Sequence, residues 1–114
     1  MQTTRQNKIC RLIQQEMGNI FLRETKEVLG SSLISVTAVR VTPDLSIARV
    51  YLSIMPIGGG TPDSIMALVR ENTADLRRRL GMHVGKQLRI IPRLEFFLDD
   101  TLDYIENINR LLKQ

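Results

Sequence analysis

Near the start of the chain, hydrophobic residues recur at spacings of three and four, which is the pattern of an amphipathic helix. These positions are Ile9, Leu12, Ile13, Met17, Ile20 and Phe21. Thr3 or Thr4 can cap the helix, because a threonine hydroxyl can accept a hydrogen bond from a backbone N–H of the first turn. We predict that the helix runs to Val28 or Leu29, with Gly30 as its stop signal.

The next two segments have the composition of β-strands. Residues 34–41 are rich in β-branched side chains, and residues 47–55 alternate between apolar and polar side chains. The intervening Thr42-Pro43-Asp44-Leu45 has turn chemistry, since proline fixes φ at the second turn position and aspartate tolerates the third. We therefore predict an antiparallel hairpin. The apolar parity of the first strand changes after Ala38, which leaves a bulge and a strand buried on both faces as alternatives.

A second helical region follows a glycine-rich loop. Thr61-Pro62-Asp63 combines an N-cap, a proline suited to the first helical position and an acid favoured by the helix dipole. The apolar stripe from Ile65 to Leu80 is interrupted by Asn72 and Thr73. Gly81 is the natural place for this helix to end or kink, and one further helical turn can follow it.

Two more elements complete the chain. Between Leu88 and Leu98 apolar and polar side chains alternate, which predicts a strand in which Pro92 marks an edge position or a bulge. With Asp100 or Thr101 as a cap, apolar residues then return to helical spacing and predict a last helix.

This order of elements predicts an α+β fold. It reads helix-strand-strand-helix-helix-strand, with a carboxyl-terminal helix. A crossover through two helices places the third strand parallel to its neighbour. We expect a single domain, residues 1–114, in which helices cover one face of a three-stranded mixed sheet. The length and a hydrophobic fraction of 43% agree with one folded domain.

The composition limits the cellular setting and the kind of contact. Cys10 is the single cysteine, so no internal disulfide can form, and no amino-terminal apolar run resembles a signal peptide or a membrane span. We therefore expect a cytoplasmic protein with no membrane partner. With no Trp, two Tyr and three Phe, the chain is expected to lack the aromatic pairs of base-stacking sheet modules. Any nucleic-acid contact would then depend on phosphates and shape.

The basic residues are clustered, although the net charge is only +4. One stretch without any acid contains Arg77, Arg78, Arg79, Lys86, Arg89 and Arg93. A second contains Arg5, Lys8 and Arg11. Clustered charges reinforce one another within about a Debye length, roughly 8 Å at physiological salt, so these nine residues are the candidate RNA-binding site. The alternative is a solvated helix surface of basic side chains. Arg49 and Arg89 are expected side by side on the open sheet face.

Catalytic chemistry has little support in the sequence. His83 and Cys10 are the only residues of their kinds, and no acid–base pair is visible beside them. The acids Asp99, Asp100 and Asp103 lack the further ligands and turn glycine of a calcium loop. Gly58-Gly59-Gly60 precedes a helix, but no Lys-Ser or Lys-Thr pair follows it. We therefore expect no enzyme activity, no cofactor and no metal.

Two segments carry a family resemblance. The order of elements resembles a type II KH domain, although Gly81 and Gly85 are too far apart to form the usual GxxG clamp. Residues 39–53, Val-Arg-Val-Thr-Pro-Asp-Leu-Ser-Ile-Ala-Arg-Val-Tyr-Leu-Ser, together with residues 92–99, Pro-Arg-Leu-Glu-Phe-Phe-Leu-Asp, resemble the signature segments of the ribosome-binding factor A family.

The resemblance implies a non-catalytic bacterial assembly factor. Its partners would be the free or precursor 30S subunit and its 16S rRNA, and it would assist late maturation, including that of the 5′ end, with importance in the cold. The family is expected to have an Ala-x-Gly kink between the central helices, but Leu76 stands where the glycine would follow Ala74, so we place the break between Ala74 and Gly81. We expect the protein to bind these partners as a monomer. The alternative function is a protein-interaction module that docks a ribosomal protein or an assembly GTPase.

Overall fold

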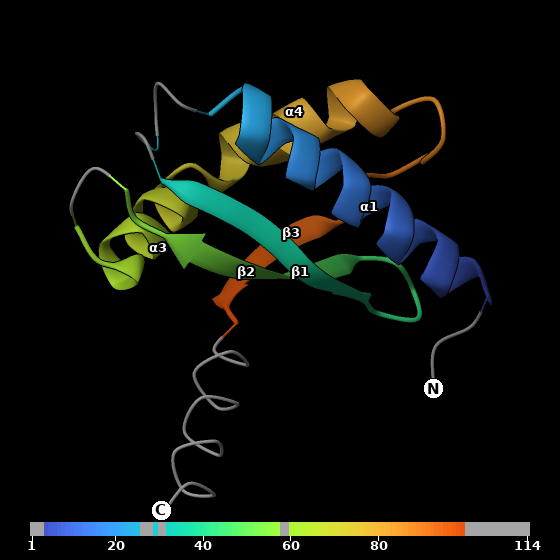
Figure 1. Ribbon diagram of the computed structural model, residues 1–114. Helices are drawn as coiled ribbons and strands as arrows, with labels where there is room; N and C mark the ends of the chain where they lie inside the picture. Colours follow the sequence, from blue (N-terminus) through green and yellow to red (C-terminus); the bar gives the residue numbers. More distant parts are fainter. Residues whose placement is uncertain (1–3, 26–28, 30–31, 58–59, 100–114) are drawn as a thin grey trace, which may run out of the picture.

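The computed structural model describes residues 4–25, 29, 32–57 and 60–99. Within them the elements are α1 (Thr4–Arg23), β1 (Leu33–Val41), β2 (Ile47–Met55), α3 (Pro62–Glu71), α4 (Thr73–Val84) and β3 (Arg93–Leu98). The strands lie in the order β1-β2-β3, with β1 antiparallel and β3 parallel to β2. This is the predicted KH-like order, and α1 and α4 lie side by side across the sheet (Figure 1). The carboxyl-terminal helix predicted after Asp100 lies outside the described residues.

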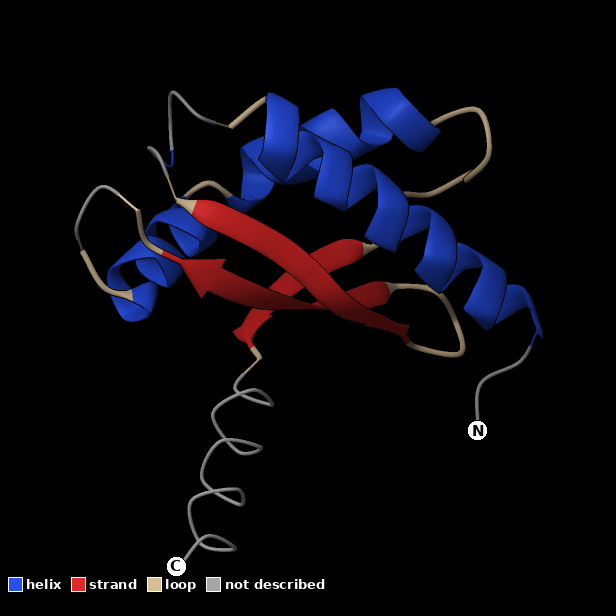
Figure 2. Cartoon of the chain, viewed as in Figure 1, coloured by secondary structure: helices blue, strands red, loops and turns tan. Residues whose placement is uncertain are grey.

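One hydrophobic core joins the helices to one face of the sheet. Ala48, Val50 and Leu52 of β2 are completely buried, whereas the alternate residues of that strand are not. The helices contribute Ile13 and Leu80, which are also completely buried. Burying each such large aliphatic side chain contributes about 1.5–3 kcal/mol. Figure 2 shows the strands as a twisted layer below α1 and α4, so among the described residues the helices cover one face of the sheet and leave the other open.

The change of parity in β1 is a bulge. The register shifts between Val36, which pairs with Leu52, and Ala38, which pairs with Tyr51. Thr37 is the extra residue, and its hydroxyl oxygen lies 3.2 Å from the Tyr51 carbonyl oxygen. The bulge allows apolar residues of both parities to face the helices. Of the two alternatives that the sequence left open, the bulge is the one found.

The break between the central helices is not where the sequence analysis placed it. It lies at Asn72, before Ala74, so the predicted position between Ala74 and Gly81 is wrong. The Asn72 side chain donates to the Leu68 carbonyl at 2.8 Å, and Thr73 Oγ1 donates to the Arg70 carbonyl at 2.8 Å. These polar side chains bind the last carbonyls of α3, which favours an end there. Gly81 remains inside α4.

Two other boundaries differ from the predicted ones. α1 ends at Arg23 rather than at Val28 or Leu29, and the Thr25 hydroxyl donates to the Phe21 carbonyl at 3.0 Å just after that end. β3 begins at Arg93 rather than at Leu88, because the Leu88 N–H donates to the Val84 carbonyl and continues the turn that follows α4. The pairing with β2 starts where the Arg93 N–H donates to the Ser46 carbonyl at 2.8 Å.

Candidate nucleic-acid interface

Three of the nine predicted bases meet in one groove, which we call the basic groove. Arg5 and Lys8 come from the first turns of α1, and Arg89 comes from the loop between α4 and β3. The β1–β2 turn closes the groove, whose volume is about 530 Å³. All three basic side chains are exposed at its rim. The fold therefore brings together members of both base-only stretches of the sequence.

Among the described residues that line the basic groove there is one carboxylate, that of Asp44 in the β1–β2 turn. Asp44 Oδ1 accepts hydrogen bonds from the hydroxyls of Thr42 at 2.7 Å and Ser46 at 2.8 Å. These bonds lower the pKa of Asp44, so the group is ionised at neutral pH. The turn itself holds this carboxylate, with Leu45 in the left-handed region at φ 61°. Three bases against one acid leave the groove positive.

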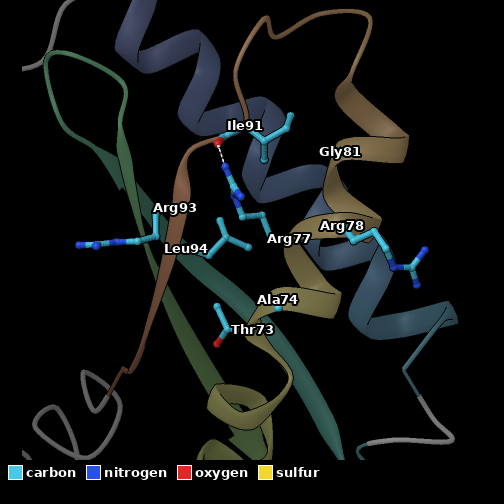
Figure 3. Close-up of a pocket in the computed structure, with 8 residues that line it drawn as sticks. All are labelled: Thr73, Ala74, Arg77, Arg78, Gly81, Ile91, Arg93 and Leu94. Atoms are coloured by element: carbon cyan, nitrogen blue, oxygen red, sulfur yellow. Dashed lines mark hydrogen bonds between the residues drawn. The ribbon is translucent and has the colours of Figure 1, made fainter.

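Arg77 of the consecutive arginine triplet is directed toward the protein. Its Nη2 donates to the Ile91 carbonyl at 2.6 Å, and its Nε donates to the Pro92 carbonyl at 3.2 Å. Figure 3 shows Arg77 reaching across to this segment, whereas Arg78 and Arg93 point away in opposite directions. Arg77 thus fixes the segment that follows Arg89, and so it positions one wall of the basic groove.

Arg78 and Arg79 share the carboxylate of Asp75. Arg78 Nη2 lies 2.7 Å from Asp75 Oδ1, and Arg79 Nε lies 2.8 Å from Asp75 Oδ2. The hydrogen bond from Arg79, and then that from Arg78, lower the pKa of Asp75. Arg79 also lies 3.3 Å from Glu24 and keeps only 25% of its side chain exposed, compared with 59% for Arg78. Arg79 therefore joins α4 to the end of α1 and presents little surface to a partner.

His83 belongs to the same contact between α1 and α4. Its Nδ1 lies 3.1 Å from Glu16 Oε2, and its Nε2 lies 2.6 Å from Glu24 Oε2. The stretch from Arg77 to Arg93 has no acid in sequence, but folding brings carboxylates of α1 against it. Sequence reasoning missed this because Glu16 and Glu24 lie far from the triplet along the chain.

The remaining predicted bases lie apart from the basic groove. Arg77, Arg78 and Arg93 line a second cleft of about 620 Å³ between α4 and β3, which also includes Ala74 and Gly81 (Figure 3). Arg11 on α1 and Lys86 after α4 are exposed, and within the described ranges neither forms an ion pair.

The open sheet face contradicts two expectations. Tyr51 and Phe97 stack there, with ring centroids 5.5 Å apart and planes at 28°, so an aromatic pair is present after all. Arg49 lies on this face and forms an ion pair with Glu95 at 3.5 Å. Arg89 is not beside it, because Arg89 precedes β3. The sequence analysis missed the stacked pair of Tyr51 and Phe97 because that pair depends on the register between β2 and β3, which no local pattern reveals.

Nearly the whole chain is similar to one family of known proteins. The family model described as ribosome-binding factor A matches residues 5–112. The chain belongs to the ribosome-binding factor A family. The ribosome-binding factor A of Cytophaga hutchinsonii is 42% identical over 114 residues, which cover 100% of this chain and 84% of that protein. That of Flavobacterium johnsoniae is also 42% identical, over 98% of this chain and 85% of its own.

Structures of ribosome-binding factor A from another bacterium share the fold. The crystal structure of ribosome-binding factor A from Thermus thermophilus matches with a TM-score of 0.67 at 20% identity, covering 82% of this chain and 94% of that one. A homology model of the Thermus thermophilus ribosome-binding factor A, fitted into a cryo-EM map of a 30S complex, matches with a TM-score of 0.60 at 22% identity. It covers 80% of this chain and 91% of that one.

Among the residues that the structure describes, none of the helices combines the length and the apolar content that a membrane span requires. In the same ranges no three His, Cys, Asp or Glu side chains are grouped so that they could hold a metal ion.

Proposed function

We propose that this chain is a ribosome assembly factor that binds the maturing 30S subunit and contacts 16S rRNA through the basic groove. The observation that carries the proposal is the convergence of Arg5, Lys8 and Arg89 around a groove whose one carboxylate, Asp44, is held by its own turn. The related Thermus thermophilus protein, placed in a 30S complex, supports the choice of particle.

Phosphate is the ligand that this groove fits best. Guanidinium groups can bind phosphate oxygens through two parallel hydrogen bonds, and Lys8 adds a mobile point charge. Arg5 and Lys8 come from α1, and Arg89 comes from the loop before β3. This distribution over two separate segments favours binding to a folded RNA surface over binding to one extended strand. Contacts of this kind position an RNA without reading its bases.

The other predicted bases have different parts in the proposal. Arg11 and Lys86 would extend the contact along α1 and beyond α4, since both are exposed. Arg78 would offer an outward guanidinium group beside the second cleft, and Arg93 would offer one on the opposite side of β3. Arg77 would act by positioning the loop that carries Arg89, and Arg79 would act by joining the two helices.

Binding would itself be the activity. A protein that binds one conformation of the rRNA more tightly than another shifts the equilibrium between them by that difference in affinity. No catalytic group is required for this, and we infer that the chain assists late maturation, including that of the 5′ end of 16S rRNA, in the cytoplasm.

Sedimentation tests this proposal. Tagged protein in bacterial extract would be run over sucrose gradients at low and high salt, beside the groove variant R5Q/K8Q/R89Q. The variant R23Q, an exposed arginine at the other end of α1, is the control. Co-migration with 30S particles at low salt, lost in high salt and in the groove variant but kept by R23Q, is expected. Migration as free protein at every salt would contradict the proposal, and salt-insensitive binding would favour docking on a protein.

A further inference from the structure

The sheet face that the helices leave open has an organised surface. The register places Tyr51 of β2 between Ala38 of β1 and Phe97 of β3. Ala38 is small and leaves the β1 side of the aromatic pair uncovered. Phe97 keeps 36% of its surface exposed, so part of the aromatic pair is accessible from this face. An aromatic pair exposed on a sheet is a surface on which an unpaired base can stack.

Arginines lie in the next row of the same face. Arg40 of β1 pairs with Arg49 of β2, which pairs in turn with Glu95 of β3. Two residues along a strand separate this row from the aromatic row, a distance of about 6.6 Å. Arg49 and Arg93 share the Glu95 carboxylate, at 3.5 and 3.4 Å. One acid among three arginines leaves this side positive.

The other side of the aromatic pair is different. Asp99 follows β3, and its carboxylate accepts a hydrogen bond from the Thr37 hydroxyl across the sheet. The face therefore has an acid at one end, two rings in the middle and arginines at the other end. A nucleotide has complementary parts, since its base stacks on rings and its phosphate requires cations.

We propose that the open sheet face binds an unpaired nucleotide of single-stranded RNA, with its base on Tyr51 and Phe97 and its phosphate on Arg40 and Arg49 in the next row and on Arg93 in the row beyond. The inference rests on the proposed function in so far as the ligand is RNA, but it places a second contact on a different surface. The basic groove would hold folded rRNA, and the sheet face would hold a neighbouring unpaired segment.

A tryptophan reporter can test this inference directly. The chain has no Trp, so F97W introduces a single one within the stack. Its emission should be quenched on titration with a ten-nucleotide single-stranded oligouridine or oligoadenosine, because base stacking brings the base against the indole. A duplex of equal length should leave the emission unchanged.

Two variants distinguish base stacking from general electrostatic attraction between the oligonucleotide and the protein. F97L and Y51L keep apolar side chains on the sheet but remove the rings, and each should weaken oligonucleotide binding about ten-fold, as expected for one lost stacking contact. The control L22A removes an exposed apolar side chain from α1 and should bind normally. Circular dichroism would confirm that each variant is folded.

The outcomes distinguish this inference from the proposed function. The groove variant R5Q/K8Q/R89Q, combined with F97W, should lose 30S binding while its tryptophan is still quenched by the oligonucleotide. Unchanged emission in F97W, or normal oligonucleotide binding by F97L and Y51L, would overturn the inference. Either result would mean that the face binds a protein partner or residues 100–114, or that Tyr51 and Phe97 form only a structural cross-strand pair. This conclusion would hold whatever the sedimentation experiment shows.

Discussion

Arg77 Nη2 donates to the carbonyl of Ile91 at 2.6 Å, and this bond joins the middle of α4 to the segment that leads into β3. The same segment carries Arg89, a wall of the basic groove. Arg77 is one of the nine candidate RNA-binding residues of the sequence analysis. Its hydrogen bonds indicate that it supports a wall of the basic groove from within the protein.

Replacing Arg77 should therefore reduce stability. R77A removes two charge-assisted hydrogen bonds to backbone carbonyls, and we expect a loss of about 1–2 kcal/mol in the free energy of unfolding, measured by urea denaturation. R78A removes an exposed ion pair and should cost less than about 1 kcal/mol. Equal losses in the free energy of unfolding for R77A and R78A would show that Arg77 has no special structural role.

The helix break at Asn72 makes a second prediction. Leu76 stands where the family resemblance would place a glycine, but it is 1% exposed in the core of α4. L76G should lower the free energy of unfolding by about 3–5 kcal/mol, because it leaves a cavity and adds a glycine to a helix interior. A74G, at an exposed position of the same helix, should cost about 1 kcal/mol. If L76G lowered the free energy of unfolding no more than A74G does, the helix would be able to kink at position 76.

Acid stability should depend on Asp75. Its pKa is lowered below the ordinary 3.8 by hydrogen bonds from Arg79 and Arg78. The stabilisation is therefore present above the unfolded-state pKa and is lost as the pH falls through the lower folded-state pKa. D75N should be less stable than the wild-type protein at neutral pH, and the difference should shrink below pH 3.8. Urea midpoints measured from about pH 7 to about pH 2.5 would show this, and a difference independent of pH would contradict it.

Local chemistry determined the parts of the fold that the sequence predicted well. The turn at Thr42-Pro43-Asp44-Leu45 and the cap at Thr61 depend on neighbouring residues only, and both formed as expected. The bulge in β1 also appeared in the sequence as a change of parity. The break at Asn72 also has a signal in the sequence, because Asn72 and Thr73 interrupt the apolar stripe and their side chains can bond helix carbonyls, whereas Gly81 is accommodated inside α4.

The arrangement of charges and rings could not be predicted in the same way. Glu24 lies beside Arg79, and Tyr51 lies beside Phe97, only because elements distant in sequence pack together. The sequence identified Arg5, Lys8 and Arg89 as basic candidates, but it could not separate them from Arg79, whose charge is used within the protein. Long-range packing decides which arginines remain available to a partner.

The salt dependence of binding to purified 30S subunits tests the central claim most directly. If about six bases contact phosphates, the logarithm of affinity should fall against the logarithm of salt concentration with a slope of roughly −4 to −5. The groove variant R5Q/K8Q/R89Q should make this slope shallower by about 2–3, at roughly 0.7–0.9 for each lost contact, while R23Q should keep the wild-type slope. Equal slopes for the groove variant and the wild-type protein would contradict a phosphate contact at the basic groove.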